Sequence, residues 1–131
     1  MTDEFKIEIV NPDQLFYSNE NMLEAVIPAF EGEIGILKDH ISIISFLKPG
    51  IIKLKLNNSD EKTFYVEDGI IEFKDNLLSI LTSNIVNLKN TSKDLFDKNL
   101  KEAEKLLEDP ELTDQQRFLT SQKVDVLKSI N

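Results

Sequence analysis

The 131-residue sequence has no cysteine and no tryptophan, only four glycines, and a single histidine, His40. Without cysteine there is no disulfide, thiolate metal ligand or thiol nucleophile. The four glycines cannot form a Gly-x-Gly-x-x-Gly or Walker phosphate loop, and no serine lies in a Gly-x-Ser-x-Gly elbow. The lone histidine has no acidic residue at helical spacing to share a metal. We therefore expect no cofactor, no metal and no catalytic residues.

Basic residues are fewer than acidic ones, 15 against 24, and the formal net charge is −9. Residues 1–88 hold 15 acidic against 7 basic side chains, so nearly all the excess negative charge lies there. An acidic surface repels phosphate backbones, which excludes nucleic acid as a partner and disfavours anionic lipid. No apolar run approaches the ~18 residues of a membrane span, and no signal peptide is evident. Any membrane association is expected to pass through a protein partner.

The first two-thirds of the sequence reads as short β-strands. Phe5, Ile7 and Ile9 alternate with polar residues, which is the period of a half-buried strand. In the segment 51–56, the isoleucine and leucines at 52, 54 and 56 are expected to face the core, with Lys53 and Lys55 facing water. Further strands are predicted at 15–17, 22–27, 33–37, 43–47, 62–67, 70–73, 77–81 and 85–88. Many short strands with turn signals between them predict a β-sandwich or barrel.

The pattern changes near Lys89, beyond which there is no glycine. Apolar residues recur at helical spacing along 96–107, and Thr91 with Asp94 forms a capping-box pattern. Pro110 is expected to end this helix, and a second capping box, Thr113 with Gln116, is expected to begin the next. The sequence thus predicts two parts: a mainly β domain over 1–88 and a two-helix C-terminal hairpin over 89–131.

Two acidic residues stand out among the polar ones. Glu31 and Glu33 flank Gly32, and on a strand their side chains would share one face. With His40 they could carry out general acid–base catalysis in a small β-sandwich enzyme. They could equally form a solvated polar loop or contact a protein partner. The residues alone leave these three interpretations open.

Several blocks of the sequence together resemble one protein family. Residues 31–37 read Glu-Gly-Glu-Ile-Gly-Ile-Leu and are followed by His40. In this order and spacing they are similar to the epsilon subunits of F-type ATP synthases. The likeness continues at residues 47–53, 64–73, 78–82 and 101–107, so it covers essentially the whole chain.

The resemblance implies a sandwich of about ten strands followed by two α-helices. It also implies a non-catalytic rotor subunit that couples rotation of the membrane c-ring to the gamma shaft. The complex would lie at the cytoplasmic face of the bacterial inner membrane. The partner interface with gamma and the c-ring would include Glu31, Gly32, Glu33, Gly35 and His40. A generic β-sandwich adaptor that binds another protein is the alternative.

The C-terminal hairpin of some family members contacts the catalytic alpha and beta subunits and inhibits ATP hydrolysis. Here the resemblance makes Arg117, Lys123 and Lys128 the candidate regulatory contacts, although acidic neighbours nearly cancel their charge. An inhibitory hairpin and a permanently docked brace both remain open.

Three positions depart from the family pattern. Leu95 stands where ATP-binding members have arginine, so we predict no ATP site. Lys38-Asp39 replaces a Pro-Gly turn, which predicts a turn of different shape. Asp68-Gly69 replaces a Gly-Gly pair, which predicts the loss of one close backbone approach.

Overall fold

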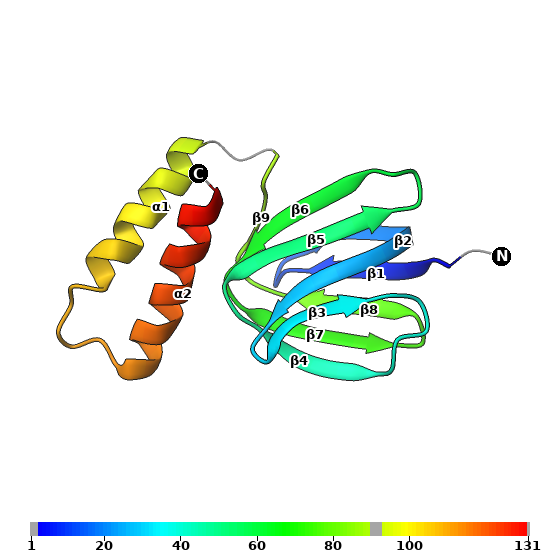
Figure 1. Cartoon of the computed structure of the whole chain (residues 1–131), viewed down its shortest axis with the longest axis horizontal. Helices are drawn as coiled ribbons and strands as arrows, with labels where there is room; N and C mark the ends of the chain where they lie inside the picture. The colour runs from blue at the N-terminus through cyan, green and yellow to red at the C-terminus, as the bar shows by residue number, and fades with distance from the viewer. Residues whose placement is uncertain (1–2, 90–92, 131) are drawn as a thin grey trace.

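The computed structural model describes residues 3–89 and 93–130 of the chain. A β-sandwich occupies the N-terminal part, and a helical hairpin lies beside one end of it (Figure 1). In chain order the elements are β1 (Phe5–Val10), β2 (Leu15–Ala29), β3 (Gly32–Ile36), β4 (Ile43–Leu47), β5 (Gly50–Leu56), β6 (Glu61–Val66), β7 (Gly69–Lys74), β8 (Leu77–Leu81), β9 (Ile85–Asn87), α1 (Lys93–Leu106) and α2 (Asp114–Ile130). The predicted fold class, a β-sandwich followed by two helices, is confirmed.

The strands form one hydrogen-bonded path in the order β1-β8-β7-β4-β2-β5-β6-β9, with β3 added to β2. One layer holds β1, β8, β7 and β4, and the other holds β3, β5, β6 and β9. Strand β2 links the layers, because its first half pairs with β1 and its second half with β3 and β5. The predicted strands 15–17 and 22–27 are both parts of β2. The described residues therefore contain nine strands rather than ten.

The core lies between the two layers. Seventeen buried apolar side chains form one cluster, including Phe5, Ile7 and Ile9 from β1. Strand β5 alternates as expected, since Ile52, Leu54 and Leu56 are buried while Lys53 and Lys55 are exposed. Alternation of this kind commits one face of each strand to the core and leaves the other available for solvent or a partner.

The second helix begins at the predicted capping box. The Thr113 amide donates to Gln116 Oε1 at 3.0 Å, and the Gln116 amide donates to Thr113 Oγ1 at 3.1 Å. These reciprocal bonds satisfy amides that the first turn leaves without helical partners. The first helix ends at Leu106, four residues before Pro110. The capping box predicted for α1 includes Thr91, which lies outside the described residues.

The helical hairpin contacts the sandwich through a small apolar seam. Tyr65, Phe96 and Leu127 are its buried members, and the Tyr65 and Phe96 rings meet edge to face with centroids 6.3 Å apart. We define the docking seam as these three residues with Val86, Leu88, Leu100, Val126 and Ile130. An ion pair lies beside it, with Lys123 Nζ 2.8 Å from Glu67 Oε1. Among the described residues no helix has the length and hydropathy needed to cross a membrane.

Candidate interaction surface

The outer face of the β1-β8-β7-β4 layer carries a row of apolar side chains near the end where the hairpin lies. Cross-strand register aligns one residue from each of five strands, because Phe46 pairs with Ile70, Ile70 with Leu81, Leu81 with Val10, and Val10 with Leu15. We call these five residues the apolar row. Four of them expose 42% to 58% of their surface: Phe46, Ile70, Leu81 and Leu15. Contiguous apolar surface of this kind is typical of a protein contact.

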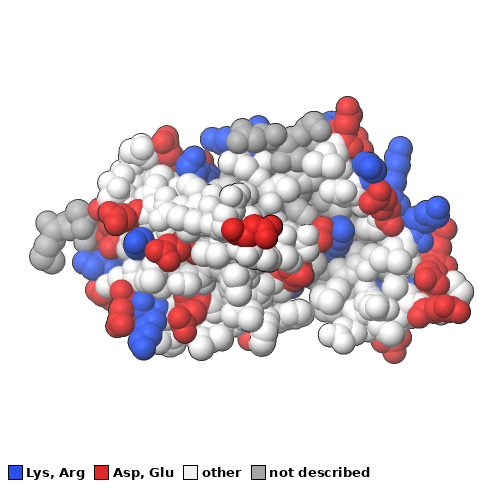
Figure 2. All heavy atoms as spheres, turned by 180° about the vertical axis from the view of Figure 1, so that it is seen from behind, with Lys and Arg blue, Asp and Glu red and all other residues white. Residues whose placement is uncertain are grey.

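The face becomes polar away from this row. The next register row holds Ile44, Glu72, Ser79 and Glu8, and the row beyond it holds Lys74, Leu77 and Lys6. Seen from behind, the molecule carries most of its charged side chains toward its two ends, with a few acidic side chains between them (Figure 2). A partner that covers the apolar row would meet acidic side chains on both sides of it, at the β6–β7 loop and in the next register row.

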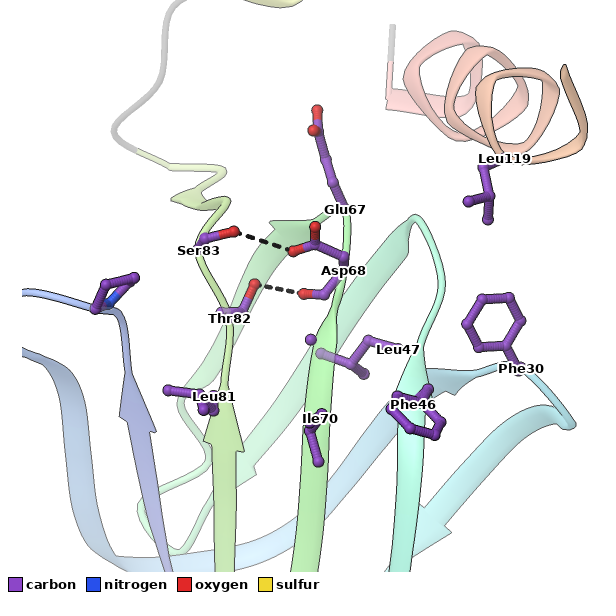
Figure 3. A pocket seen from close by; sticks show the side chains of 12 residues that line it. Phe30, Phe46, Leu47, Glu67, Asp68, Ile70, Leu81, Thr82, Ser83 and Leu119 are labelled. Carbon is purple, nitrogen blue, oxygen red and sulfur yellow. Dashed lines mark hydrogen bonds between the residues drawn. The ribbon is translucent and has the colours of Figure 1, made fainter. Parts of the chain in front are cut away.

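A groove runs beside the apolar row, with a volume of about 560 Å³. Phe46, Ile70 and Leu81 form its floor, and Leu119 points from α2 toward Phe30 at one side (Figure 3). Glu67 and Asp68 lie at its rim. The amide of Phe30 donates to the carbonyl of Phe46, which holds the Phe30 turn against the sheet. The groove is thus bounded by both the sandwich and the hairpin.

The rim loop between β6 and β7 is held in place by one close backbone contact and two hydroxyl hydrogen bonds. Gly69 has a φ of +145°, and a Cβ there would collide with the carbonyl oxygen of Leu81. The hydroxyl of Thr82 donates to the Asp68 carbonyl at 2.5 Å, and that of Ser83 donates to Asp68 Oδ1 at 3.3 Å. Gly69 thus makes one close backbone approach, and the predicted loss of a second one at Asp68 stays a prediction.

Glu31, Gly32 and Glu33 lie together at the β2–β3 turn, on the side of the sandwich that faces the hairpin (Figure 1). Ser45 Oγ donates to Glu31 Oε2 at 2.6 Å. This bond, helped by a bond from the residue's own backbone, lowers the pKa of Glu31. Glu33 is exposed, and Gly32 has a φ of +128°, which glycine adopts readily. The turn thus holds Glu31 in place and presents Glu33 to the surroundings.

His40 lies at the opposite end of β3, in the connection to β4. Its ring contacts Phe73 edge to face, and its Nδ1 is 2.7 Å from the carbonyl oxygen of Ile41. Strand β3 carries the chain roughly 10 Å from Glu33 to Ile36, at about 3.3 Å per residue, and His40 lies beyond that end. The three residues of the enzymatic hypothesis therefore do not converge on one site.

The Lys38-Asp39 turn is closed by a side-chain clamp. Asp39 has a φ of +65°, which glycine adopts at lower cost than aspartate. The Asp39 amide donates to Asn76 Oδ1 at 2.7 Å, and Asn76 Nδ2 donates to Asp39 Oδ1 at 3.0 Å. This pair of bonds joins the β3–β4 connection to the β7–β8 turn.

Gly35 differs from the other glycines of the predicted interface. It lies within β3 opposite Val26, and a Cβ there would have no neighbour within 4 Å. In the described residues β3 pairs only with β2, so Gly35 lies on an edge strand. Neither packing nor backbone conformation requires glycine here, which leaves close approach by a partner as a reason for it.

The basic residues of the hairpin have partners within the chain. Arg117 donates to the carbonyls of Leu107 and Asp109, at 2.7 and 3.1 Å, and so closes the loop between the helices. Lys123 pairs with Glu67 of the sandwich. Lys128 is exposed. The docked hairpin therefore holds two of the three candidate regulatory residues against its own chain. The predicted lack of an ATP site at Leu95 stays a prediction.

Over residues 3–89 and 93–130, no three histidine or acidic side chains gather where they could hold a metal ion. The surface instead has a groove with an apolar floor and an acidic rim, and a separate exposed carboxylate at Glu33. Such an arrangement can bind a protein, because apolar contact supplies affinity and charge supplies orientation.

Sequence reasoning did not identify the apolar row. The signal was present, since β4 has apolar residues on both faces and β7 begins with two consecutive isoleucines, a pattern typical of strands covered on both sides. Phe46 and Ile70 alternate with the core residues Leu47 and Ile71, so they had to face outward. Their register with Leu81 and Val10 depends on strand pairing, which the sequence does not show.

Comparison with known proteins identifies the family. The family described as "ATP synthase, Delta/Epsilon chain, beta-sandwich domain" matches residues 4–88. The ATP synthase epsilon chain of Pelagibacter ubique is 58% identical over 131 residues, which span all of both chains. That of Dichelobacter nodosus is 33% identical over 111 residues, covering 85% of this chain and 77% of the relative.

Two solved structures share the fold. A chain of the Euglena gracilis mitochondrial ATP synthase (OSCP/F1/c-ring) has a TM-score of 0.78 at 19% identity, covering 98% of this chain and 79% of that one. A chain of the Tetrahymena thermophila mitochondrial ATP synthase central stalk and c-ring has a TM-score of 0.67 at 13% identity, with coverages of 98% and 96%. The family match and the two relatives above 30% identity show that the chain belongs to the ATP synthase epsilon chain family, and hence that it is a non-catalytic subunit of the ATP synthase complex.

Proposed function

We propose that this subunit works in the central stalk as a rigid clamp, which couples rotation of the c-ring to the gamma shaft. The observation that carries the proposal is the apolar row, which five strands place side by side on the exposed outer face of one layer. The shaft would cover this row and bury its side chains. A clamp requires stiffness and partner surfaces, and the continuous core of the sandwich supplies the stiffness.

The ring contact is proposed at the β2–β3 turn. Glu33 is exposed there, and its carboxylate could accept charge-assisted hydrogen bonds from a basic ring loop. His40 lies at the other end of β3, so one small loop cannot contact both residues. We therefore assign Glu33, with Glu31 and Gly32, to the ring, and His40, with Gly35, to gamma.

The two parts of the chain are proposed to act as separate units, a clamp over residues 1–88 and a hairpin over 89–131. The hairpin is either a brace, as its docked position supports, or an inhibitor that is released to reach the catalytic alpha and beta subunits. Release would free Lys123 from Glu67 to act with the exposed Lys128, whereas Arg117 would stay bonded to the loop within the hairpin. The subunit would lie at the cytoplasmic face of a bacterial inner membrane, held there by the complex.

Binding to purified gamma subunit tests the clamp. Phe46→Ser is expected to weaken binding about tenfold or more, because it removes the aromatic side chain of the apolar row, which is the most exposed of its members. Phe118→Ser is the matched control, since Phe118 is similarly exposed but lies on α2 outside the groove. Equal binding of the two variants, or no binding by the unmodified chain, would refute this placement of gamma.

Charge reversal tests the ring contact. Glu33→Lys in the assembled complex is expected to lower the ratio of ATP made to protons passed, because two positive charges would then face each other. Glu61→Lys, on an exposed position at the start of β6, is the control. Unchanged coupling in Glu33→Lys would place the ring contact elsewhere.

A further inference from the structure

The groove beside the apolar row is formed by two parts of the chain that are far apart in sequence. Leu119 of α2 lies at one side of it, while the floor and rim belong to the sandwich (Figure 3). If the hairpin moved away, the groove would lose this side and become an open sheet face. The shape offered to a partner therefore depends on where the hairpin lies.

The rim also connects the groove to the hairpin. Glu67 lines the groove and forms the ion pair with Lys123, which stands one helical turn after Leu119 on α2. The Tyr65 hydroxyl lies 3.4 Å from the same carboxylate, and the Tyr65 ring is buried in the docking seam. A partner bound in the groove would thus lie next to Glu67, whose contacts with Lys123 and Tyr65 help to hold the hairpin against the sandwich.

The charge of the groove indicates what kind of segment it takes. Among the described residues that line it, Glu67 and Asp68 are the charged ones, and both are acidic. The Glu67 charge is paired with Lys123, whereas Asp68 is exposed and its carboxylate accepts a hydroxyl bond from Ser83. The fitting occupant is a protein segment with an apolar ridge and a basic residue placed to meet Asp68.

We propose that the docked hairpin is part of the gamma-binding surface. A gamma segment with an apolar ridge and a basic flank would occupy the groove and touch Leu119. This inference rests on the proposed function and adds the hairpin to its surface. Because binding energies are reciprocal, gamma would then hold the hairpin in its docked position as strongly as docking favours gamma.

Leu119→Ala and Phe118→Ala form the main test, as neighbouring residues on α2 of which only Leu119 lines the groove. In the full-length chain with purified gamma subunit, Leu119→Ala is expected to weaken binding about five- to fiftyfold, within the usual range of coupling. Phe118→Ala should bind within twofold of the unmodified chain. Lys123→Gln should weaken binding by a smaller factor, about two- to fivefold, because partly exposed ion pairs contribute little.

Hairpin position is the second readout. Because the chain has no cysteine, one label can be placed on the sandwich and one on α1, through Lys55→Cys and Glu104→Cys at exposed positions. Adding gamma is expected to narrow the distribution of distances between the two labels to the value of the docked hairpin. In Leu119→Ala the same addition should narrow the distribution less.

Two outcomes would overturn the inference while leaving the clamp intact: gamma binding Leu119→Ala as tightly as the unmodified chain, or gamma lengthening the label distance. Failure of the unmodified chain to bind gamma would instead overturn the proposed function itself.

Discussion

The sandwich and the helical hairpin differ in how much apolar side chain each one buries. In the described residues the sandwich core joins seventeen buried apolar side chains, whereas the docking seam has three. Burial of apolar surface is the main favourable term in folding, so the sandwich is expected to stay folded while the hairpin undocks. One chain can thus contain a rigid body and a second element that is held to it by a much smaller free energy of docking.

The largest expected effect is on the sandwich. Phe73→Ala removes a ring that packs edge to face on Phe5 and also contacts His40. A cavity of this kind is expected to lower the free energy of unfolding by about 3–5 kcal/mol. The midpoint of urea unfolding would report it. A loss below about 1 kcal/mol would show that the core is far looser than its burial indicates.

The hairpin should respond differently to loss of a buried side chain. Leu127 is fully buried in the docking seam, and Leu127→Ala is expected to cost about 2 kcal/mol or more. Because the seam is small, this cost should appear as faster amide exchange in α2, with the main unfolding midpoint nearly unchanged. A fall in that midpoint as large as for Phe73→Ala would mean that the two parts unfold together.

High pH should loosen the hairpin by a smaller amount. Burial, followed by the charge of Glu67, raises the pKa of Tyr65 above its ordinary value of 10. A raised tyrosine pKa means that its contribution is complete below about pH 10 and is lost as pH rises further. Hairpin docking, followed by the label distance, should therefore weaken above about pH 10.

Substitutions separate Tyr65 from the other tyrosine, Tyr17, whose pKa is also raised by burial. Tyr65→Phe should reduce the pH dependence, while Tyr17→Phe should not alter it. An identical pH profile in Tyr65→Phe would show that Tyr65 does not cause the effect.

The smallest expected effect is at Gly35. A Cβ there meets nothing within 4 Å, so Gly35→Ala should change the free energy of unfolding by no more than about 0.5 kcal/mol. If gamma approaches β3 closely, the same variant should bind gamma more weakly. Unchanged stability with unchanged gamma binding would remove Gly35 from the interface.

Local chemistry made much of this fold predictable. The alternation in β5 and the capping box at Thr113 depend on neighbours within a few residues, and both are confirmed. The two predicted strands within β2 were wrong as separate elements, because a polar stretch between them continues the strand through pairing with β1. Such pairing involves distant residues, and local propensity does not reveal it.

The candidate interaction surface was likewise predictable from the sequence in some parts and not in others. The blocks around Glu31 and Gly69 carried the family resemblance in the sequence. Strand direction decided that Glu33 and His40 lie at opposite ends of β3. Pairing of β7 with its neighbours in one layer decided that Gly69 needs to be glycine, while Gly35 on the edge strand does not.

By itself the sequence determined which segments become strands or helices, which faces are apolar, and that no thiol chemistry occurs, because these properties depend on residue type and local spacing. Only the tertiary structure decided that Phe46, Ile70 and Leu81 form one exposed row, and that Leu119 borders a groove with them. The physical reason is that cross-strand register and helix docking bring together side chains more than seventy residues apart, through contacts that no short stretch of sequence contains.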